Sequence, residues 1–299
     1  ADVAFQSGQA HGADTIAATG ALAMAPFARV HEYLKRCEAL FDQFLEIVEL
    51  GDADFPTVDV NGTVIPSAAA SEYRGKGPHL GQAGKFEVLI LPGQAELDRY
   101  LRHANGLRRA TSNRVFVRET DAQQLVLHFN GGLMWADMAI YSNVAHGLAH
   151  NFLRGLEHDD YFVFPWLEIG LAHSFERDIS HTDNSFCSNA EAFTQAYELG
   201  DWNGAIKAQL RERKAPYLER LLKLEHERDF ALADHLLAWS LTRFLLEEHP
   251  KAYGGILRDI KGITAGKPSI GIEQLHTAHR DAFAKHMDMY HDPAEIDAD

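Results

Sequence analysis

Two histidines four residues apart, His146 and His150, are the residues of this chain whose type and spacing best suit metal chemistry. Residues i and i+4 of a helix lie on the same face, one turn apart. Two imidazoles at that spacing can bind one metal ion, and zinc is commonly held in this way. Because zinc is usually tetrahedral, the pair needs at least one further protein ligand. The sequence therefore predicts a zinc site on a helix, completed by a residue from another segment.

The segment that runs from Pro165 to Arg177 is predicted to be a second helix, and it offers two candidates for the further ligand. Glu168 is the nearest acidic residue, and His173 follows it five residues later. Glu168 is either a metal ligand or a residue outside the ligand shell, at the surface or behind the imidazoles. A metal-free alternative also stays open, in which both imidazoles of the pair are hydrogen-bonded groups of the core.

The two segments read SNVAHGLAH and PWLEIGLAHSFE, and together they resemble the core of gluzincin metallopeptidases of the small peptidase-MA-like kind. That family reads H-E-x-x-H, a short loop, then P-x-W-L-x-E-G-x-A-x-Y-F-E, with the glutamate after W-L-x as third zinc ligand. The matching scaffold positions are Trp166, Leu167, Gly170, Ala172, Phe175 and Glu176, with Pro165 one place closer than usual. The resemblance implies a zincin-like α+β fold, a zinc ion at His146 and His150 for which Glu168 is the nearest candidate third ligand, and a cleft that accepts a peptide or protein.

Both acidic residues that carry out peptide hydrolysis in that family are replaced here. The general-base glutamate that follows the first histidine is Gly147, and the third-ligand position is Ile169, with Glu168 one place earlier. One residue on a helix is a rotation of about 100°. A glutamate at position 168 is therefore not expected to point where one at position 169 would. Losing a general base should cost about 10²–10⁴ in rate.

These replacements favour a degenerate gluzincin-like protein, a pseudoenzyme that lacks ordinary peptidase activity and retains a metal at His146 and His150. Two alternatives remain. One is an active zinc-dependent hydrolase or peptidase in which another carboxylate, such as Glu168, has become the base. The other is a metal-free module that binds a peptide or protein in the cleft between the two lobes. Whether the protein is an enzyme is left open by the sequence.

His235 is a further candidate catalytic residue, within the segment ALADHLLAWSLTRFLLEEHP. In similar domains a helix across the cleft presents a tyrosine or histidine that stabilises the oxyanion. Alignment on Phe244 and Leu245 puts His235 near that place. The alternative is a half-buried helix histidine that is hydrogen-bonded to a neighbour. Other polar clusters are interpreted as solvated surface, namely His276, His279 and His286 in the last helix, and the stretch 226–229.

Composition excludes several other classes of function. The formal net charge of −15 would repel a phosphate backbone, so nucleic acid is not expected as a partner. No run of about 18 apolar residues is present, so no membrane-spanning helix is expected. The two cysteines, Cys37 and Cys187, are too few for a disulfide scaffold, although one disulfide stays open. The chain begins at Ala1 without a signal peptide, and together with the resemblance this leans toward a mature secreted or periplasmic protein.

Helix and strand signals outline an α+β fold with a small twisted sheet, the His-bearing helix and a helical C-terminal lobe. Residues 1–22 are predicted to be a poorly packed lead-in, 23–178 the α+β lobe and 179–299 the helical lobe. The dipeptide Asn61-Gly62 predicts a hairpin within TVDVNGTVIP. The strand 85–91 is predicted as well, followed by a second antiparallel pair, 114–120 and 123–129. The His-bearing helix is predicted to lie in the segment that begins at Trp135, and the other predicted helices are 23–50, 94–103, 165–177, 189–199, 202–213, 216–225, 231–248, 251–261 and 272–290.

Overall fold

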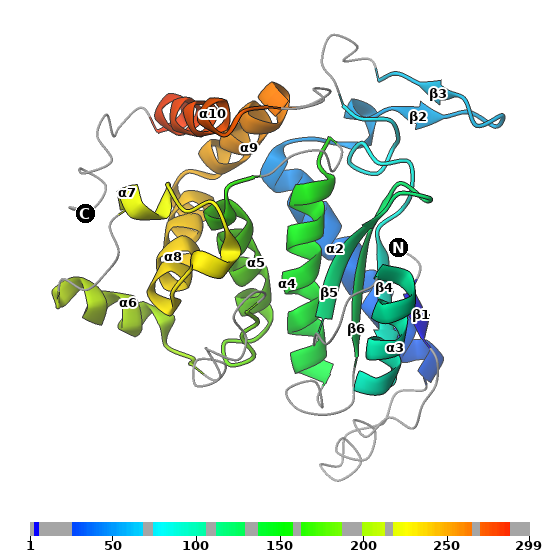
Figure 1. Cartoon of the computed structure of the whole chain (residues 1–299), viewed down its shortest axis with the longest axis horizontal. Helices are drawn as coiled ribbons and strands as arrows, with labels where there is room; N and C mark the ends of the chain where they lie inside the picture. The colour runs from blue at the N-terminus through cyan, green and yellow to red at the C-terminus, as the bar shows by residue number, and fades with distance from the viewer. Residues whose placement is uncertain are drawn as a thin grey trace.

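The protein is an α+β molecule in which a mixed sheet packs against a layer of helices (Figure 1). This computed structural model describes residues 3–5, 26–67, 74–105, 112–128, 137–157, 163–186, 199–212, 218–264 and 270–287. The strand order of the larger sheet is β1-β4-β6-β5. Its strands are β1 (Val3–Phe5), β4 (Glu87–Leu91), β5 (Ser112–Val117) and β6 (Ala122–His128). β4 runs parallel to β1 and β6, whereas β5 is antiparallel to β6 and lies at one edge.

The predicted antiparallel pair is confirmed as β5 and β6, in a register that places Arg114 opposite Leu125. Strand β1 was not predicted, because the first 22 residues contain few large apolar side chains. Three residues of this lead-in pair with β4 all the same. Backbone pairing to an existing sheet edge therefore recruits a segment that carries little periodic signal of its own.

The predicted hairpin is confirmed as a separate two-stranded sheet of β2 (Thr57–Val58) and β3 (Val64–Ile65), which projects from the body (Figure 1). Its strands are shorter than the apolar pattern suggests. The Asp59 carboxylate accepts hydrogen bonds from the backbone N–H groups of Asn61 and Thr63, both at 2.8 Å. An aspartate that satisfies the backbone in this way favours a turn over a longer ladder. Gly62 completes that turn with a φ of 80°.

The helices follow the predicted order, with shifted ends. They are α2 (Pro26–Val48), α3 (Gln94–Asn105), α4 (Asp137–Gly155), α5 (Pro165–Ile179), α6 (Trp202–Arg211), α7 (Leu218–Leu221), α8 (Leu232–Glu248), α9 (Pro250–Thr264) and α10 (Ile272–His286). The helix predicted over 216–225 is reduced to the single turn α7 in the described residues. The helix predicted over 189–199 lies almost entirely outside the described residues.

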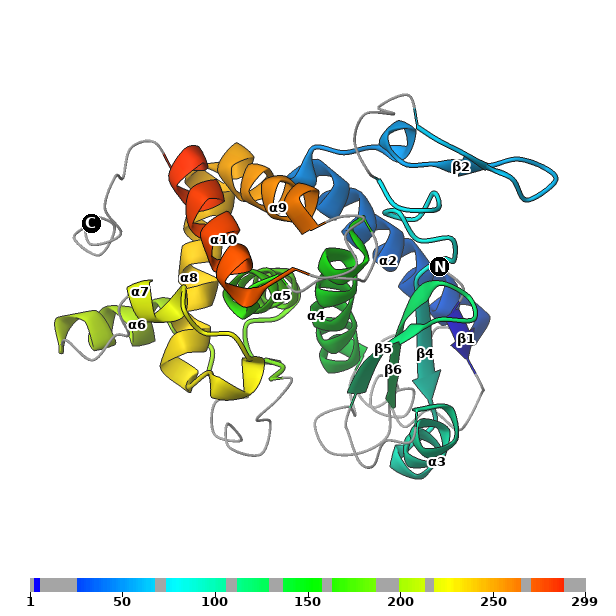
Figure 2. The same ribbon diagram turned by 45° about the horizontal axis from the view of Figure 1, so that its top comes forward.

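Helix α4 occupies the centre of the molecule, with the sheet on one side and α5 on the other (Figure 2). One hydrophobic cluster includes Leu125 of the sheet, Phe152 of α4, Trp166 of α5, Leu241 of α8 and Tyr253 of α9. Burying a side chain of this size contributes about 1.5–3 kcal/mol. The core is therefore continuous across residue 178, where composition changes. In the described part of the chain, no helix is both long and apolar enough to cross a membrane.

The interpretation of the α10 histidines as a solvated face is wrong for His279. Its side chain is buried, and its ring lies edge-on to Phe164 with ring centroids 3.8 Å apart. His276 and His286 are half-buried and lie 3.0 Å from Glu225 and 2.9 Å from Asp259. The reason is that α10 packs along α9 and over the start of α5, which covers a face that would be solvated on an isolated helix.

Candidate metal centre

The polar residues predicted to do chemistry lie where α4 and α5 face each other. His146 and His150 are on α4, whereas Glu168, His173 and Glu176 are on α5, and all five are buried. Two groups in the described residues could hold a metal ion, because the candidate ligand atoms of each lie within 4.8 Å of one another. The Glu176 group is His146, His173 and Glu176, and the Glu227 group is His150, Glu168 and Glu227.

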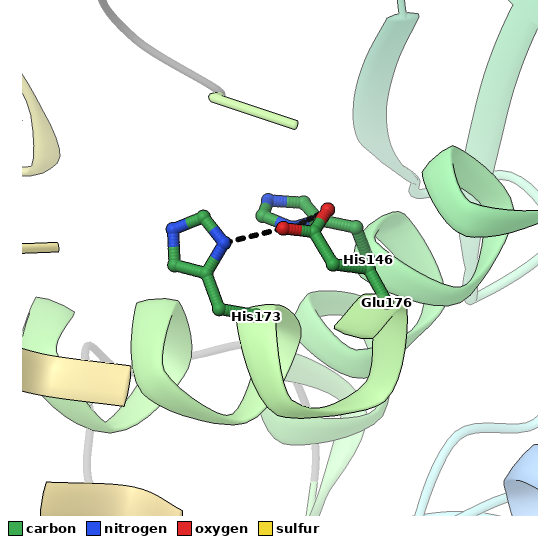
Figure 3. Close-up of side chains that lie close together, drawn as sticks. All are labelled: His146, His173 and Glu176. Carbon is green, nitrogen blue, oxygen red and sulfur yellow. Dashed lines mark hydrogen bonds and ion pairs between the residues drawn. The ribbon is translucent and has the colours of Figure 1, made fainter. Parts of the chain in front are cut away.

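The carboxylate of Glu176 is shared between two imidazoles (Figure 3). Its Oε2 lies 2.9 Å from Nδ1 of His146, and its Oε1 lies 2.5 Å from Nδ1 of His173. The backbone N–H of Ser185 also donates to Oε2, at 2.9 Å. His173 and Glu176 are three residues apart, which places them on one face of α5. The Glu176 group is thus a compact set of two ring nitrogens and one carboxylate.

The protonation states of Glu176 and His173 are those that a metal requires. Burial alone would raise the pKa of Glu176, but His146 and His173 more than offset this and hold the pKa at about 2. Burial lowers the pKa of His173 below its usual value, against the opposing effect of Glu176. The carboxylate is therefore ionised and the imidazole of His173 is neutral at neutral pH. Metal ligands must be in these states before they can bind.

His235 of α8 lies next to this group. Its Nδ1 is 2.9 Å from Nε2 of His173. Because Nδ1 of His173 donates to the ionised Glu176, Nε2 of the same neutral ring accepts the hydrogen bond from His235. Burial, with a smaller effect of His173, lowers the pKa of His235 well below its usual value. His235 therefore contacts the centre through His173.

The four imidazoles form a row along the interface. Ring centroids are 5.1 Å apart for His150 and His146, 5.1 Å for His146 and His173, and 5.2 Å for His173 and His235. Two imidazoles on one tetrahedral zinc, with Zn–N bonds of about 2.0–2.1 Å, would have centroids about 5 Å apart. The spacing suits shared ligation both for the predicted pair and for His146 with His173.

Two cations, Arg114 and Arg154, contact the carboxylates of the Glu227 group. Nδ1 of His150 lies 3.1 Å from Oε2 of Glu168 and 3.8 Å from Oε1 of Glu227. Arg154 donates to both carboxylates, at 3.2 Å and 3.3 Å, and Arg114 donates to Glu227 at 3.2 Å. Two guanidinium groups already balance the two carboxylates. This group suits a metal cation less well than the Glu176 group does.

The structure divides the predicted ligand set His146, His150 and Glu168 between the two groups. His150 and Glu168 are brought together, whereas His146 faces Glu176. Glu168 is buried and reaches the second histidine of the pair, and the neighbouring Ile169 is buried too. The pairing of carboxylates with imidazoles depends on how α4 and α5 cross. The spacing of residues along the sequence does not define that crossing.

Sequence reasoning missed two functional candidates. Glu176 was taken as a scaffold position, although its spacing of three from His173 is a usable signal. The interpretation of 226–229 as solvated surface is wrong for Glu227, whose side chain is only 16% exposed. Nothing in the polar stretch that contains Glu227 distinguishes its buried carboxylate from the exposed charges beside it.

Gly147 lies against the sheet. A β-carbon at this position would be 2.6 Å from Cδ1 of Leu125, on strand β6. Glycine thus allows α4 to approach β6 closely. This explains the residue without reference to catalysis, and it means that a glutamate here could enter only if Leu125 moved.

No protein-family model, curated protein or solved structure matches this chain.

A pocket of about 220 Å³ opens beside the Glu227 group, with Glu168, Glu227 and Arg154 in its wall. Val163 and Pro165 supply apolar surface to the same pocket. The Glu227 group is therefore adjacent to solvent, whereas the Glu176 group is enclosed by α4, α5 and α8.

Proposed function

We propose that this protein is a zincin-like metal-binding protein without ordinary peptidase activity, and that it holds one zinc ion at the Glu176 group. The observation that carries the proposal is the convergence of His146, His173 and Glu176, whose donor atoms lie within 4.8 Å of one another. Two histidines and a glutamate are a ligand set that zinc takes in proteins. When bound, zinc would act as a Lewis acid at this site.

The surroundings of the group support the same proposal. Metal ligands are oriented by outer partners, which are commonly backbone groups or other side chains that hydrogen-bond to them. The Ser185 N–H fixes Glu176, and His235 fixes the ring of His173. Because Nδ1 of His173 carries a proton in the hydrogen bond to Glu176, zinc could bind through that atom only if the proton moved to Nε2 of the same neutral ring. Nδ1 of His235, 2.9 Å from Nε2, would then accept the hydrogen bond from His173 instead of donating one.

The expected loss of peptidase activity has two supports. The position of the missing general base, Gly147, lies against Leu125. The substitute considered from the sequence, Glu168, is held by Arg154 at 3.2 Å and His150 at 3.1 Å. Oε2 of this carboxylate therefore already accepts a hydrogen bond from a charged donor, which a water molecule would have to displace at that oxygen. An active hydrolase that uses Glu168 as its base is thus the less favoured alternative.

A metal-free binding module is favoured by one specific observation. Nδ1 of His146 and Nδ1 of His150 each already lie about a hydrogen-bond length from a carboxylate, at 2.9 Å and 3.1 Å. Buried polar groups that satisfy one another can give a core its specificity without any metal. In this alternative the row of histidines joins α4 to α5 and α8, and a ligand would bind elsewhere on the protein.

The experiment that tests the proposal combines metal content with activity. The purified protein is dialysed against chelator, reloaded with zinc, desalted, and analysed for zinc and for cleavage of unfolded casein. We expect about one zinc per chain and no proteolysis that chelator abolishes. Absence of zinc after reloading would favour the metal-free module. Chelator-sensitive proteolysis would favour the active hydrolase.

A further inference from the structure

Glu227 is a partly buried carboxylate on an otherwise exposed turn. It begins the short 3-10 turn Glu227–Asp229 that precedes α8. The side chains of Arg228 and Asp229 are 73% and 51% exposed, whereas that of Glu227 is 16% exposed. Of the three charged side chains in this turn, only that of Glu227 therefore points inward.

Two arginines from different elements donate hydrogen bonds to this carboxylate. Arg114 of the edge strand β5 donates to Oε1 at 3.2 Å and to Oε2 at 3.4 Å. Arg154 of α4 donates to Oε1 at 3.3 Å. Arginine is the side chain best suited to bind a carboxylate, because its planar guanidinium offers several donors in a fixed geometry. The pair would recognise any carboxylate that occupied the position of Glu227.

The charges around this position favour an anion over a cation. Burial lowers the pKa of His150 well below its usual value, with Arg114 as the next contribution, so the ring is neutral. Without Glu227, the site would hold Arg114, Arg154 and the carboxylate of Glu168, a net charge of +1. A metal ion would lose one of its possible ligands and face two guanidinium groups. The carboxylate of a ligand would replace the charge of Glu227 and return the site to a net charge of zero.

The adjoining pocket gives space for the rest of a ligand. Its volume of about 220 Å³ is below the usual 300–1,000 Å³ of drug-sized ligand sites, so it suits a small molecule or the end of a peptide. Glu227 and Arg154 lie in its wall, and Val163 and Pro165 provide an apolar side. A ligand can therefore place its carboxylate between the arginines and an apolar part in the pocket.

We propose that Arg114 and Arg154 form a carboxylate-binding site that Glu227 fills from within the chain, and that a ligand carboxylate takes this site when the Glu227 side chain swings out. The site is separate from the Glu176 group, so the proposal holds with or without bound zinc. Glu227 competes with the ligand and so lowers its apparent affinity in the wild type.

The test is titration calorimetry with N-acetylglycine, which carries a main-chain carboxylate, and with N-acetylglutamic acid α-amide, which carries a side-chain carboxylate. The chargeless control is N-acetylglycine methyl ester. Glu227→Gln should bind one of the acids at least about tenfold more tightly than the wild type does, because its competitor is gone. Adding Arg114→Gln should remove that gain. The acid that binds more tightly shows whether the site prefers a main-chain or a side-chain carboxylate.

A second measurement uses the wild type, in case Glu227→Gln does not fold. Hydrogen exchange of the amides of 226–230 is followed with either acid and with the ester. Faster exchange with an acid and not with the ester supports displacement of Glu227. The proposal is overturned if Glu227→Gln folds and binds neither acid at about 10 mM, if it binds no better than the wild type, or if neither acid changes exchange in the wild type.

Discussion

Glu176 and His146 meet across the interface of α4 and α5, with Oε2 of the carboxylate 2.9 Å from Nδ1 of the imidazole. The same carboxylate bonds to His173, so one side chain joins a histidine of each helix. In the completely buried setting of Glu176 this arrangement keeps the carboxylate ionised. The protein therefore maintains an anion in its core, beside the neutral imidazole of His173, where a metal cation would be attracted.

Glu176→Gln should abolish zinc binding at this group and destabilise the protein. The amide has nearly the same shape but brings no charge, and its NH₂ group would face donors. Breaking a buried charged interaction by changing one partner costs about 3–5 kcal/mol. Zinc titration and urea unfolding measure the two effects. Glu273→Gln, on the exposed side of α10, is the matched control and should change neither. Unchanged zinc affinity in Glu176→Gln would remove this residue from the centre.

Gly147→Glu should not create a peptidase, although it would complete an H-E-x-x-H motif at positions 146–150. The new side chain would begin 2.6 Å from Leu125, so packing α4 against β6 would be disturbed. Overpacking of this kind costs about 1–3 kcal/mol. The unfolding free energy should fall in Gly147→Glu and partly recover in the double variant with Leu125→Ala. Casein cleavage by either variant would show that the base is the only missing part.

Stability should depend on pH through His279. Burial, and to a smaller degree His276, lowers the pKa of His279 to about 2. The native state keeps this ring neutral, whereas the unfolded state takes up a proton below about pH 6.5. The contribution of the neutral His279 ring to the free energy of unfolding is thus fully present above about pH 6.5. It is lost as the pH falls, by about 1.4 kcal/mol per pH unit.

The check is urea unfolding with chelator at several pH values between about 4.5 and 7.5, where this linkage acts. His279→Leu has no titrating ring, so its unfolding free energy should fall less steeply with acid than that of the wild type. His276 neighbours His279 on the same face and is half-buried, which makes His276→Leu a suitable comparison. Equal slopes in wild type and His279→Leu would contradict the buried neutral state.

Cys37 should resist thiol reagents in the native protein. It is a free thiol buried in the core, and burial raises its pKa to about 12. The thiolate is the reactive form, so both access and ionisation are suppressed. The other cysteine of the chain, Cys187, lies outside the described residues. In a Cys187→Ser variant, a chromogenic disulfide reagent should react only after unfolding. Rapid reaction of the native variant would contradict the buried setting.

Much of the framework of the site follows from the sequence. The apolar periodicity of α4 and the pattern of α5 predict two buried helices, and the spacing of His146 and His150 places both rings on one face. The α+β class and the β5–β6 pair are also predictable, since alternating apolar residues flank a short turn. These features are local, because each depends on residues within a few turns or one strand of one another.

The assignment of ligands to partners is not local. Glu168 contacts His150 and Glu176 contacts His146 because of the way α5 lies across α4. Glu227 joins them from a turn that precedes α8, and its polar neighbours make it resemble a surface residue. Only the packed structure reveals that such a carboxylate lies between two arginines.

The measurement that tests the central claim most directly is the zinc content of the reloaded protein by elemental analysis, for wild type, His173→Ala, His150→Ala and the control His103→Ala, at an exposed position of α3. We expect about one zinc per chain in the wild type and in His103→Ala, loss in His173→Ala, and retention in His150→Ala. Zinc that persists in His173→Ala but is lost in His150→Ala would place the metal at the Glu227 group. A wild type that takes up no zinc would contradict the account altogether.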